Sequence, residues 1–269
     1  MNKIYLCGDL HQDFYPIEAF LERIDYQIDC SDKIIILGDF CANYFCNGDA
    51  REEYFKKKIN SIGCKFLIIR GNHEERVSNL ISNDWELHIK NSYSLSPISQ
   101  KENYSYYIEK KYPNICYLPD EPSILYLNGY RILILPGAYS VDKFYRIKKH
   151  LKWFKDEQMT VEEMNQVRNF IAENNKFDFI LSHTCPSSLV PKDLFIKDVD
   201  QSLVDNSMED FFEEVRQKTS YKAWVWGHFH EYRYYGLDEQ GRQHLMLFND
   251  SLIELNDLIG NKKILLTKN

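Results

Sequence analysis

The segment Ile4-Tyr5-Leu6-Cys7-Gly8-Asp9-Leu10-His11 lies near the start of the chain. Its first four residues form a short apolar run, which predicts a buried strand. The glycine lets the backbone turn sharply, so that Asp9 and His11 come to the edge of the predicted sheet. Because sites form at the carboxyl ends of parallel strands, these two side chains are candidate functional residues.

The same pattern, an apolar run followed by glycine and a metal-capable side chain, occurs three more times. The segments are Gly38-Asp39, Gly71-Asn72-His73-Glu74 and Gly227-His228-Phe229-His230. His183 also follows an apolar run, at 179–181. Each residue alone has a structural explanation, since Asp9 would serve as a helix cap and His183 as a core histidine. The chain has only 11 glycines and 8 histidines, however, and their convergence on strand ends favours one shared metal site.

Apolar runs and helical periodicities alternate along the first 70 residues. The runs predict strands at 4–7, 34–37 and 66–69, and apolar repeats of three to four residues predict helices at 14–29 and about 50–62. This βαβαβ order predicts a parallel sheet and an α/β fold. Helices are also predicted at 160–174, after a capping box at Thr160 and Glu163, and at 207–217. The whole chain, 1–269, is interpreted as a single domain.

Two segments interrupt this pattern. The first, at about 83–130, is rich in tyrosine, and the second is a loop at about 186–206. Both follow motif strands, so we expect them to border the site and to set the size of the substrate. Tyr104, Tyr106 and Tyr107 have two explanations, stacking on a nucleobase or packing in the sheet, and packing is favoured.

The composition narrows the class of protein. The 269 residues are 44% hydrophobic and 27% charged, which is ordinary for a globular protein with a core. The net charge of -7 argues against an extended nucleic-acid footprint. No apolar run approaches the roughly 18 residues of a membrane helix, and the N-terminus turns polar too soon for a signal peptide. Seven cysteines without a CxxC pair indicate a reducing compartment, and we expect a cytoplasmic protein.

The candidate metal ligands comprise two carboxylates, one amide oxygen and four imidazoles. They are Asp9, His11, Asp39, Asn72, His183, His228 and His230. Nitrogen and oxygen ligands without thiolate suit divalent transition metals, with manganese favoured and iron or zinc as alternatives. Seven ligands are too many for one tetrahedral ion, which predicts two ions about 3.5–4 Å apart that share an aspartate. A water between the ions would lose a proton near neutral pH and attack phosphorus.

The motifs between residues 8 and 230 follow one another in the order of the five blocks GDxH, GDxxDR, GNHE, H and GHxH, and in this they resemble the calcineurin-like metallophosphoesterase superfamily. The chain is most similar in type to the bacterial and phage members of that superfamily. The resemblance implies a four-layer α/β/β/α sandwich of two mixed β-sheets. It implies one metal held by Asp9, His11, Asp39 and His230, and another held by Asp39, Asn72, His183 and His228, with Asp39 as the bridge. It also implies that His73 is catalytic, contacting the phosphate and protonating the leaving oxygen, which suits the titration range of imidazole.

The second block departs from the family pattern. Ala42 and Asn43 stand where the family has Asp and Arg, which in serine/threonine phosphatases support the catalytic histidine and grip the phosphate. Asn43 still offers an amide that could donate a hydrogen bond to substrate. Arg70 matches the protein phosphatase branch, but a solvent-facing or ion-paired position at the strand end is favoured for it.

Another block, Pro136-Gly137-Ala138-Tyr139-Ser140-Val141-Asp142-Lys143-Phe144-Tyr145-Arg146, follows the strand predicted at 131–135. It is similar to a Gly-Gly-Ala-x-Ser-x-Asp-x-x-x-Arg block of bacterial and phage members. Tyr139, Asp142 and Arg146 are therefore candidate substrate-binding residues, because a planar guanidinium suits phosphate. The alternative is that Asp142 caps a helix at 143–151 and pairs with Arg146 at i,i+4. Both interpretations stay open.

Together these features predict a dinuclear phosphoesterase that hydrolyses a phosphomonoester or a phosphodiester through metal-bridged hydroxide. A small-molecule or nucleotide-like substrate is favoured, because Ala42 and Asn43 replace the Asp-Arg pair. The alternative is a serine/threonine phosphoprotein phosphatase, supported by Arg70 and Glu74, and a nuclease for short oligonucleotides is a third enzyme class. A non-catalytic scaffold on the same fold is a further alternative, against which the intact ligand set counts.

Overall fold

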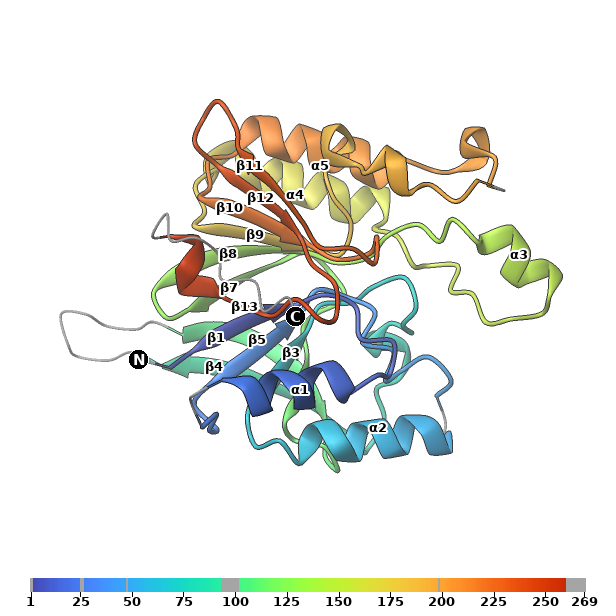
Figure 1. The fold of residues 1–269 in the computed structure, drawn as a ribbon, viewed down its shortest axis with the longest axis vertical. Coiled ribbons are helices and arrows are strands. Elements are labelled where there is room, and N and C mark those ends of the chain that lie inside the picture. The colour runs from blue at the N-terminus through green and yellow to red at the C-terminus, as the bar shows by residue number, and fades with distance from the viewer. Residues whose placement is uncertain (1, 25–26, 47, 93–101, 198, 260–269) are drawn as a thin grey trace.

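The computed structural model describes residues 2–24, 27–46, 48–92, 102–197 and 199–259, so that Tyr93 and the rest of 93–101 lie outside the described residues. Strands and helices alternate over residues 4–68 and again over residues 161–226 (Figure 1), which confirms the α/β class. The described α-helices are α1 (Tyr15–Arg23), α2 (Ala50–Asn60), α3 (Lys143–Lys148), α4 (Val161–Glu173) and α5 (Ser207–Lys218). The described strands are β1 (Ile4–Cys7), β2 (Lys33–Ile36), β3 (Lys65–Ile68), β4 (Trp85–Ser92), β5 (Glu102–Glu109), β6 (Ile115–Tyr117), β7 (Ser123–Leu127), β8 (Tyr130–Leu135), β9 (Phe179–Ser182), β10 (Ala223–Trp226), β11 (Arg233–Leu237), β12 (Gln243–Met246) and β13 (Ile253–Glu254).

The first half of the molecule places β1, β2 and β3 in parallel register. Alternate strand residues face opposite sides, so Ile34 and Ile36 pack against one buried cluster and Ile35 against another. The first of these clusters also contains Ile17 of α1 and Phe55 of α2, which places both helices on that face. The helix predicted at 14–29 ends at Arg23, because Ile24 is extended.

The second half repeats this plan with β8, β9, β10 and β12 in parallel register. Trp224 and Trp226 of β10 pack with Met164 of α4 and Phe212 of α5. The predicted capping box opens α4, since Thr160 accepts a hydrogen bond from the Glu163 backbone and the Glu163 side chain accepts one from the Thr160 backbone.

The buried cluster that contains Ile35 lies between the halves. It combines inner-face residues of the first half, such as Leu6 and Ile35, with those of the second half, such as Leu181 and Val225. Figure 1 shows α4 and α5 along one outer side of the strands and α1 and α2 along the other. All the described strands belong to one hydrogen-bonded sheet, in which β5 joins the halves by pairing with both β6 and β7, and β4 lies off the main path because it pairs with β5 alone.

The tyrosine-rich insert supplies β4, β5, β6 and β7 of this sheet. Tyr104 is buried in the cluster between the halves, and Tyr106 and Tyr107 pack against buried clusters, which agrees with the packing explanation. No described residue of 83–130 lines either cavity beside the predicted ligands, so the expectation that this insert borders the site is wrong for that part of the chain. Among the described helices, none has the length and apolar character needed to cross a membrane.

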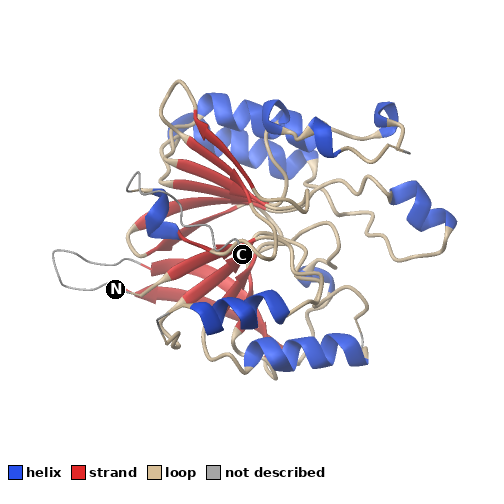
Figure 2. Ribbon diagram, viewed as in Figure 1, coloured by secondary structure: helices blue, strands red, loops and turns tan. Residues whose placement is uncertain are grey.

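The predicted ligands follow strands of both halves. The loops after β1, β2, β3, β9 and β10 gather at one end of the strands, on the right in Figure 2. Helix α3 and the segment 186–206 project beyond the same end (Figure 1). The fold therefore brings five sequence-distant strand ends together and sets two irregular segments beside them.

Candidate metal centre and its cavity

Backbone hydrogen bonds tie the motif segments to one another. The amides of Leu10 and His11 both donate to the carbonyl oxygen of Asp39, at 3.1 and 2.8 Å. The amide of Gly227 donates to the carbonyl of His183 at 3.0 Å. The amide of His228 donates to Oδ1 of Asp9 at 2.9 Å, which fixes the last motif against the first.

Four predicted ligands hold a left-handed backbone conformation. The φ angles of His11, Asp39, His228 and His230 are 48°, 46°, 73° and 54°. Such angles cost about 1 kcal/mol or more for a residue with a side chain, and they concentrate at functional sites. The strained positions coincide with the ligands predicted from sequence, which supports a functional role for this edge.

The motif glycines serve mainly to make room. Of the four, only Gly38 has a positive φ, 99°. A Cβ at Gly71 would overlap Oδ1 of Asp39, and one at Gly227 would overlap Oδ1 of Asp9. The sharp turn expected from sequence is thus a minor reason for these glycines, and close approach of the carboxylates is the major one.

One set of donor atoms converges around Asp9. One ligand atom from each of Asp9, His11, Asp39 and His230 lies within 4.8 Å of the others. Nε2 of His11 lies 2.8 Å from Nε2 of His230, which in turn lies 3.3 Å from Oδ2 of Asp9. Nδ1 of His11 lies 3.5 Å from Sγ of Cys41, so Nε2 is the nitrogen directed at this set.

The second predicted set shares Asp39. Nε2 of His183 lies 3.5 Å from Oδ1 of Asp39 and 2.9 Å from Oδ1 of Asn72. Nδ1 of His183 contacts the carbonyl oxygen of Leu37 at 2.7 Å, which leaves Nε2 as the nitrogen available to a metal ion. The ring of His228 lies 5.0 Å from that of His183 between centroids. The arrangement therefore suits two neighbouring ions that share Asp39.

The charges of the carboxylates also suit cations. Burial raises the pKa of Asp39, but His73 and His183 outweigh it and hold the pKa well below its usual value. Burial likewise opposes ionisation of Asp9, whose pKa is nevertheless lowered by His183 and His230. Two buried, ionised carboxylates at hydrogen-bond distance from imidazoles are a typical metal-free form of a metal site.

The imidazoles differ in protonation. Burial, together with His183, lowers the pKa of His228 to about 3, so this ring is neutral and can donate a lone pair. Burial also lowers the pKa of His183, but Asp39 and Asp9 reverse the effect and raise it to about 9. A metal ion would have to displace the proton of His183.

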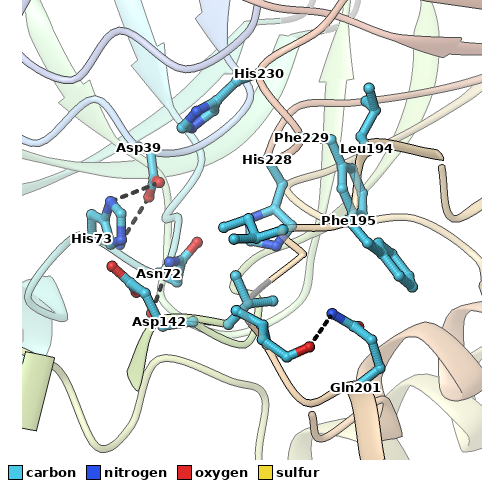
Figure 3. Close-up of a pocket in the computed structure, with 14 residues that line it drawn as sticks. Asp39, Asn72, His73, Asp142, Leu194, Phe195, Gln201, His228, Phe229 and His230 are labelled. Atoms are coloured by element: carbon cyan, nitrogen blue, oxygen red, sulfur yellow. Dashed lines mark hydrogen bonds and ion pairs between the residues drawn. The ribbon is translucent and has the colours of Figure 1, made fainter. Parts of the chain in front are cut away.

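His73 lies beside the shared carboxylate. Its amide donates to Oδ1 of Asp39 at 2.8 Å, and its Nδ1 lies 3.2 Å from Oδ2 (Figure 3). Burial lowers the pKa of His73, against the opposing effect of Asp39. The ring lines the cavity described below, so Nε2 is the nitrogen free to meet a substrate.

Sequence reasoning missed three residues that hold the ligands. The side-chain amide of Asn72 donates to Oγ of Ser140 at 2.9 Å, and that hydroxyl donates to the buried Glu157 at 2.6 Å. Glu74 is also buried and accepts the amides of Gly71 and Cys41, which joins the third motif to the second. Ser140 and Glu74 stand inside quoted motifs, whereas nothing in the sequence marks Glu157.

The predicted substrate-binding residues lie in different places. Asn43 is 3% exposed and lines a small cavity with Arg70 and Glu74, a position that does not support contact with substrate. Tyr139 is buried but lines a cavity next to the metal ligands. Arg146 donates through Nε to both oxygens of Asp142 at 2.8 Å, so the i,i+4 pair exists, although no side-chain cap from Asp142 is formed.

Arg146 also approaches the site indirectly. Its Nη1 donates to the hydroxyl of Tyr44 at 3.0 Å, and the Tyr44 ring lies 6.3 Å from that of His73. Arg70, by contrast, is 4% exposed, donates to the carbonyl of Glu157 at 2.7 Å and lies 3.8 Å from Asp120. The ion-paired interpretation of Arg70 thus agrees with the structure, and the solvent-facing one is wrong.

A cavity of about 320 Å³ opens over these groups. We call one side the metal wall, formed by Asp39, Asn72, His73, His228 and His230, and the other the apolar wall, formed by Val141, Leu194, Phe195, Ile196, Val199 and Phe229. Figure 3 shows Leu194, Phe195 and Phe229 across the cavity from Asp39 and His73. The loop 186–206 therefore borders the site, as expected.

Comparison with known proteins agrees with this site. The sequence matches the calcineurin-like phosphoesterase family model over residues 2–232. No curated protein matches it. Among solved structures, the chain is similar to the protein TT1561 of Thermus thermophilus, with 10% identity, 96% of each chain covered and a TM-score of 0.49.

Two further solved structures show a comparable similarity. One is a dimetal phosphatase from Danio rerio, with 11% identity, 94% of this chain and 95% of that chain covered and a TM-score of 0.44. The other is the phosphopantetheinyl hydrolase of Mycobacterium tuberculosis, with 12% identity, 97% and 93% covered and a TM-score of 0.40. The match of the family model over most of the sequence carries the assignment: this chain belongs to the calcineurin-like phosphoesterase family.

Proposed function

We propose that this protein is a dinuclear metal-dependent phosphoesterase that hydrolyses a phosphomonoester or a phosphodiester. The observation that carries the proposal is the convergence of Asp9, His11, Asp39 and His230 beside a second set that shares Asp39. When bound, two divalent ions supply charge neutralisation at the phosphoryl group and an activated water nucleophile. Manganese is our first choice, with iron and zinc as alternatives, since the donors are nitrogen and oxygen.

The residues of the chain divide the remaining work. Asp9, His11 and His230 would hold one ion, and Asn72, His183 and His228 the other, with Asp39 between them. His73 would carry a proton on Nε2 to the leaving oxygen, because Nδ1 faces Asp39. The apolar wall excludes water from one side of the phosphoester, which strengthens electrostatic interactions within the cavity.

Arg70 no longer supports the alternative that this protein is a phosphoprotein phosphatase. The guanidinium of Arg70 is enclosed by the carbonyl of Glu157 and by Asp120, and Arg70 does not line the cavity over the metal wall. It is therefore placed to brace the strand end rather than to bind phosphate. Arg146 lines neither cavity, and we propose that it positions Tyr44 beside His73 rather than binding substrate itself.

The first experiment measures metal content and hydrolysis together. Protein purified without chelator would be analysed for metals and then assayed with added Mn²⁺, Fe²⁺ or Zn²⁺ on p-nitrophenyl phosphate, bis-p-nitrophenyl phosphate and a phosphopeptide. We expect about two ions per chain and hydrolysis of at least one small ester. Turnover of the phosphopeptide alone would indicate the phosphatase alternative. Less than one ion per chain without metal-restored hydrolysis would indicate the scaffold.

His73→Gln tests the proton-transfer role separately. The variant should keep its metals and lose about 10²- to 10⁴-fold in kcat, the usual contribution of general acid catalysis. The loss should be larger for ethyl phosphate than for p-nitrophenyl phosphate, because nitrophenolate leaves readily without a proton. Equal losses on both esters would show that His73 positions the phosphate instead.

A further inference from the structure

The cavity over the metal wall adjoins a second cavity of about 460 Å³. Four residues line both cavities: Val141, Asp142, Ile196 and Val199. A group bound at the metal wall therefore lies next to the second cavity. For scale, about 150 Å³ is enough to hold a benzene molecule in an apolar cavity.

The second cavity is lined mainly by apolar and aromatic side chains. Besides the shared residues, these include Tyr139, Phe144, Tyr145 and Leu203. No lysine or arginine lines either cavity among the described residues. In the second cavity a negatively charged group would find no lysine or arginine among the described lining residues, and the ammonium of Lys143 lies 5.5 and 5.9 Å from the ring centroids of Tyr139 and Phe144.

The acidic residues of this lining already have local partners. Asp142 accepts the Nε of Arg146 at 2.8 Å. Asp200 accepts the amide and the hydroxyl of Ser202, at 3.0 and 2.7 Å. Neither carboxylate is therefore an unpartnered group aimed at a cation, and the chemistry that the second cavity offers is apolar contact.

Large apolar side chains around the second cavity are unusually exposed. Phe144 and Tyr145 are each 57% exposed, Ile196 is 55% exposed and Leu203 is 60% exposed. Clustered exposure of this kind marks a binding surface, because covering such side chains is favourable. Ile196 belongs both to this surface and to the lining of the cavity over the metal wall, so the surface begins at the edge of that cavity.

We infer that the substrate is a phosphoester whose organic group is apolar, an aliphatic chain or an aromatic ring system, and that this group occupies the second cavity. The inference rests on the proposed function and narrows it. A nucleoside polyphosphate or an acidic phosphopeptide fits this cavity poorly, since its negative charges would lie against apolar walls. The metal wall then recognises the phosphoryl group, and the second cavity selects the alcohol.

The experiment uses two series in which the basicity of the leaving group hardly changes, because 4-nitrophenolate leaves from every diester and a primary alkoxide leaves from every monoester. Alkyl 4-nitrophenyl phosphate diesters from ethyl to octyl, and the matching alkyl phosphate monoesters, would be assayed with the metal-loaded full chain. Each methylene buried is worth roughly a threefold gain in kcat/KM. Allowing for partial burial, we expect at least about a tenfold rise from ethyl to hexyl in one of the two series.

Two matched variants locate the effect. Ile196→Asn places a neutral polar group at the junction of the cavities and should flatten the dependence on chain length. Ile81→Asn changes a residue of similar exposure, 52% against 55%, that lines neither cavity, and it should keep the wild-type dependence. The comparison uses the ratio of hexyl to ethyl, so that a general loss of activity does not affect it.

A binding measurement provides a readout that does not depend on turnover. Hexylphosphonate should bind more tightly than ethylphosphonate, with a more negative heat-capacity change, and Ile196→Asn should remove the difference. Hydrolysis without dependence on chain length, or a dependence equally lost in Ile81→Asn, would overturn the inference and leave the proposed function intact. Absence of hydrolysis on every ester with metal bound would overturn the proposed function itself.

Discussion

The metal wall and the apolar wall face each other but are built differently. The metal wall consists of strand-end residues fixed by backbone hydrogen bonds, positive φ angles and glycines that admit a carboxylate. The apolar wall comes largely from the loop 186–206, with Val141 before α3 and Phe229 after β10, and it contains the exposed side chains of Phe195 and Ile196. The difference indicates that the first wall sets the chemistry and the second sets the choice of substrate. Substitutions on the two walls should therefore differ in kind.

The largest effect is expected from Asp39→Asn. Asp39 contacts His73 and His183 and belongs to the cluster with Asp9, His11 and His230, so its charge serves both proposed ions. We expect less than one ion per chain and a loss of at least about 10³-fold in kcat/KM, since metal catalysis is worth several kcal/mol. Metal analysis and hydrolysis measure both quantities. The exposed Asp210→Asn is the control, and two retained ions in Asp39→Asn would contradict a shared ligand.

Gly71→Ala tests whether the metal wall depends on close packing. The added Cβ would overlap the Asp39 carboxylate, which should lower metal affinity by about 10- to 100-fold, as changes around metal ligands do. Gly63→Ala is the matched control, because Gly63 has a φ of 90° but nothing lies within 4 Å of the added Cβ. The control should lose stability, measured by denaturant unfolding, and keep its metal affinity. Equal losses of affinity would assign the effect to general destabilisation.

Much of the metal wall could be predicted from the sequence. Short apolar runs that end in glycine mark β1, β2, β3 and β10, and the ligand side chains follow directly. The spacing is local, so a pattern of a few residues carries the information. The reason for the glycines was only partly predictable, because the overlap of Gly71 with Asp39 joins segments over 30 residues apart.

The apolar wall and the supporting residues could not be predicted in the same way. Glu157 reaches Ser140 across an irregular segment without periodicity, and its partner is fixed only by the fold. The second cavity, between the α3 region and the residues Ile196, Val199 and Leu203, also arises from segments that no motif connects. The density of tyrosines at 104–107 is also typical of a surface that stacks on a ligand. In the structure these side chains are instead buried in, or packed against, the hydrophobic clusters of the sheet.

Metal affinity should rise with pH, and this dependence tests whether His183 of the metal site is protonated before an ion binds. The pKa of His183 is raised to about 9, so this ring carries a proton below that pH in the metal-free protein. An ion must displace the proton, and affinity should increase about tenfold per pH unit between pH 6.5 and 8.5 for one proton released. Competition titration with a chelator of known affinity measures this slope. A flat profile would show that His183 is already neutral.

The smallest effect is expected from Ser140→Ala, which lies where the two walls meet. Its hydroxyl accepts the side-chain amide of Asn72 and donates to Glu157, so the substitution frees Asn72 to rotate without removing a ligand. We expect roughly a tenfold loss of affinity at one of the two ions, at the low end of changes around metal ligands. Ser188→Ala is the matched control, because Ser188 also donates its hydroxyl to a glutamate, Glu213, away from both cavities. If Ser140→Ala lowered the affinity for neither ion, the contact with His183 alone would be enough to hold Asn72. The hydrogen bonds from Asn72 to Ser140 and from Ser140 to Glu157 would then be dispensable for metal binding.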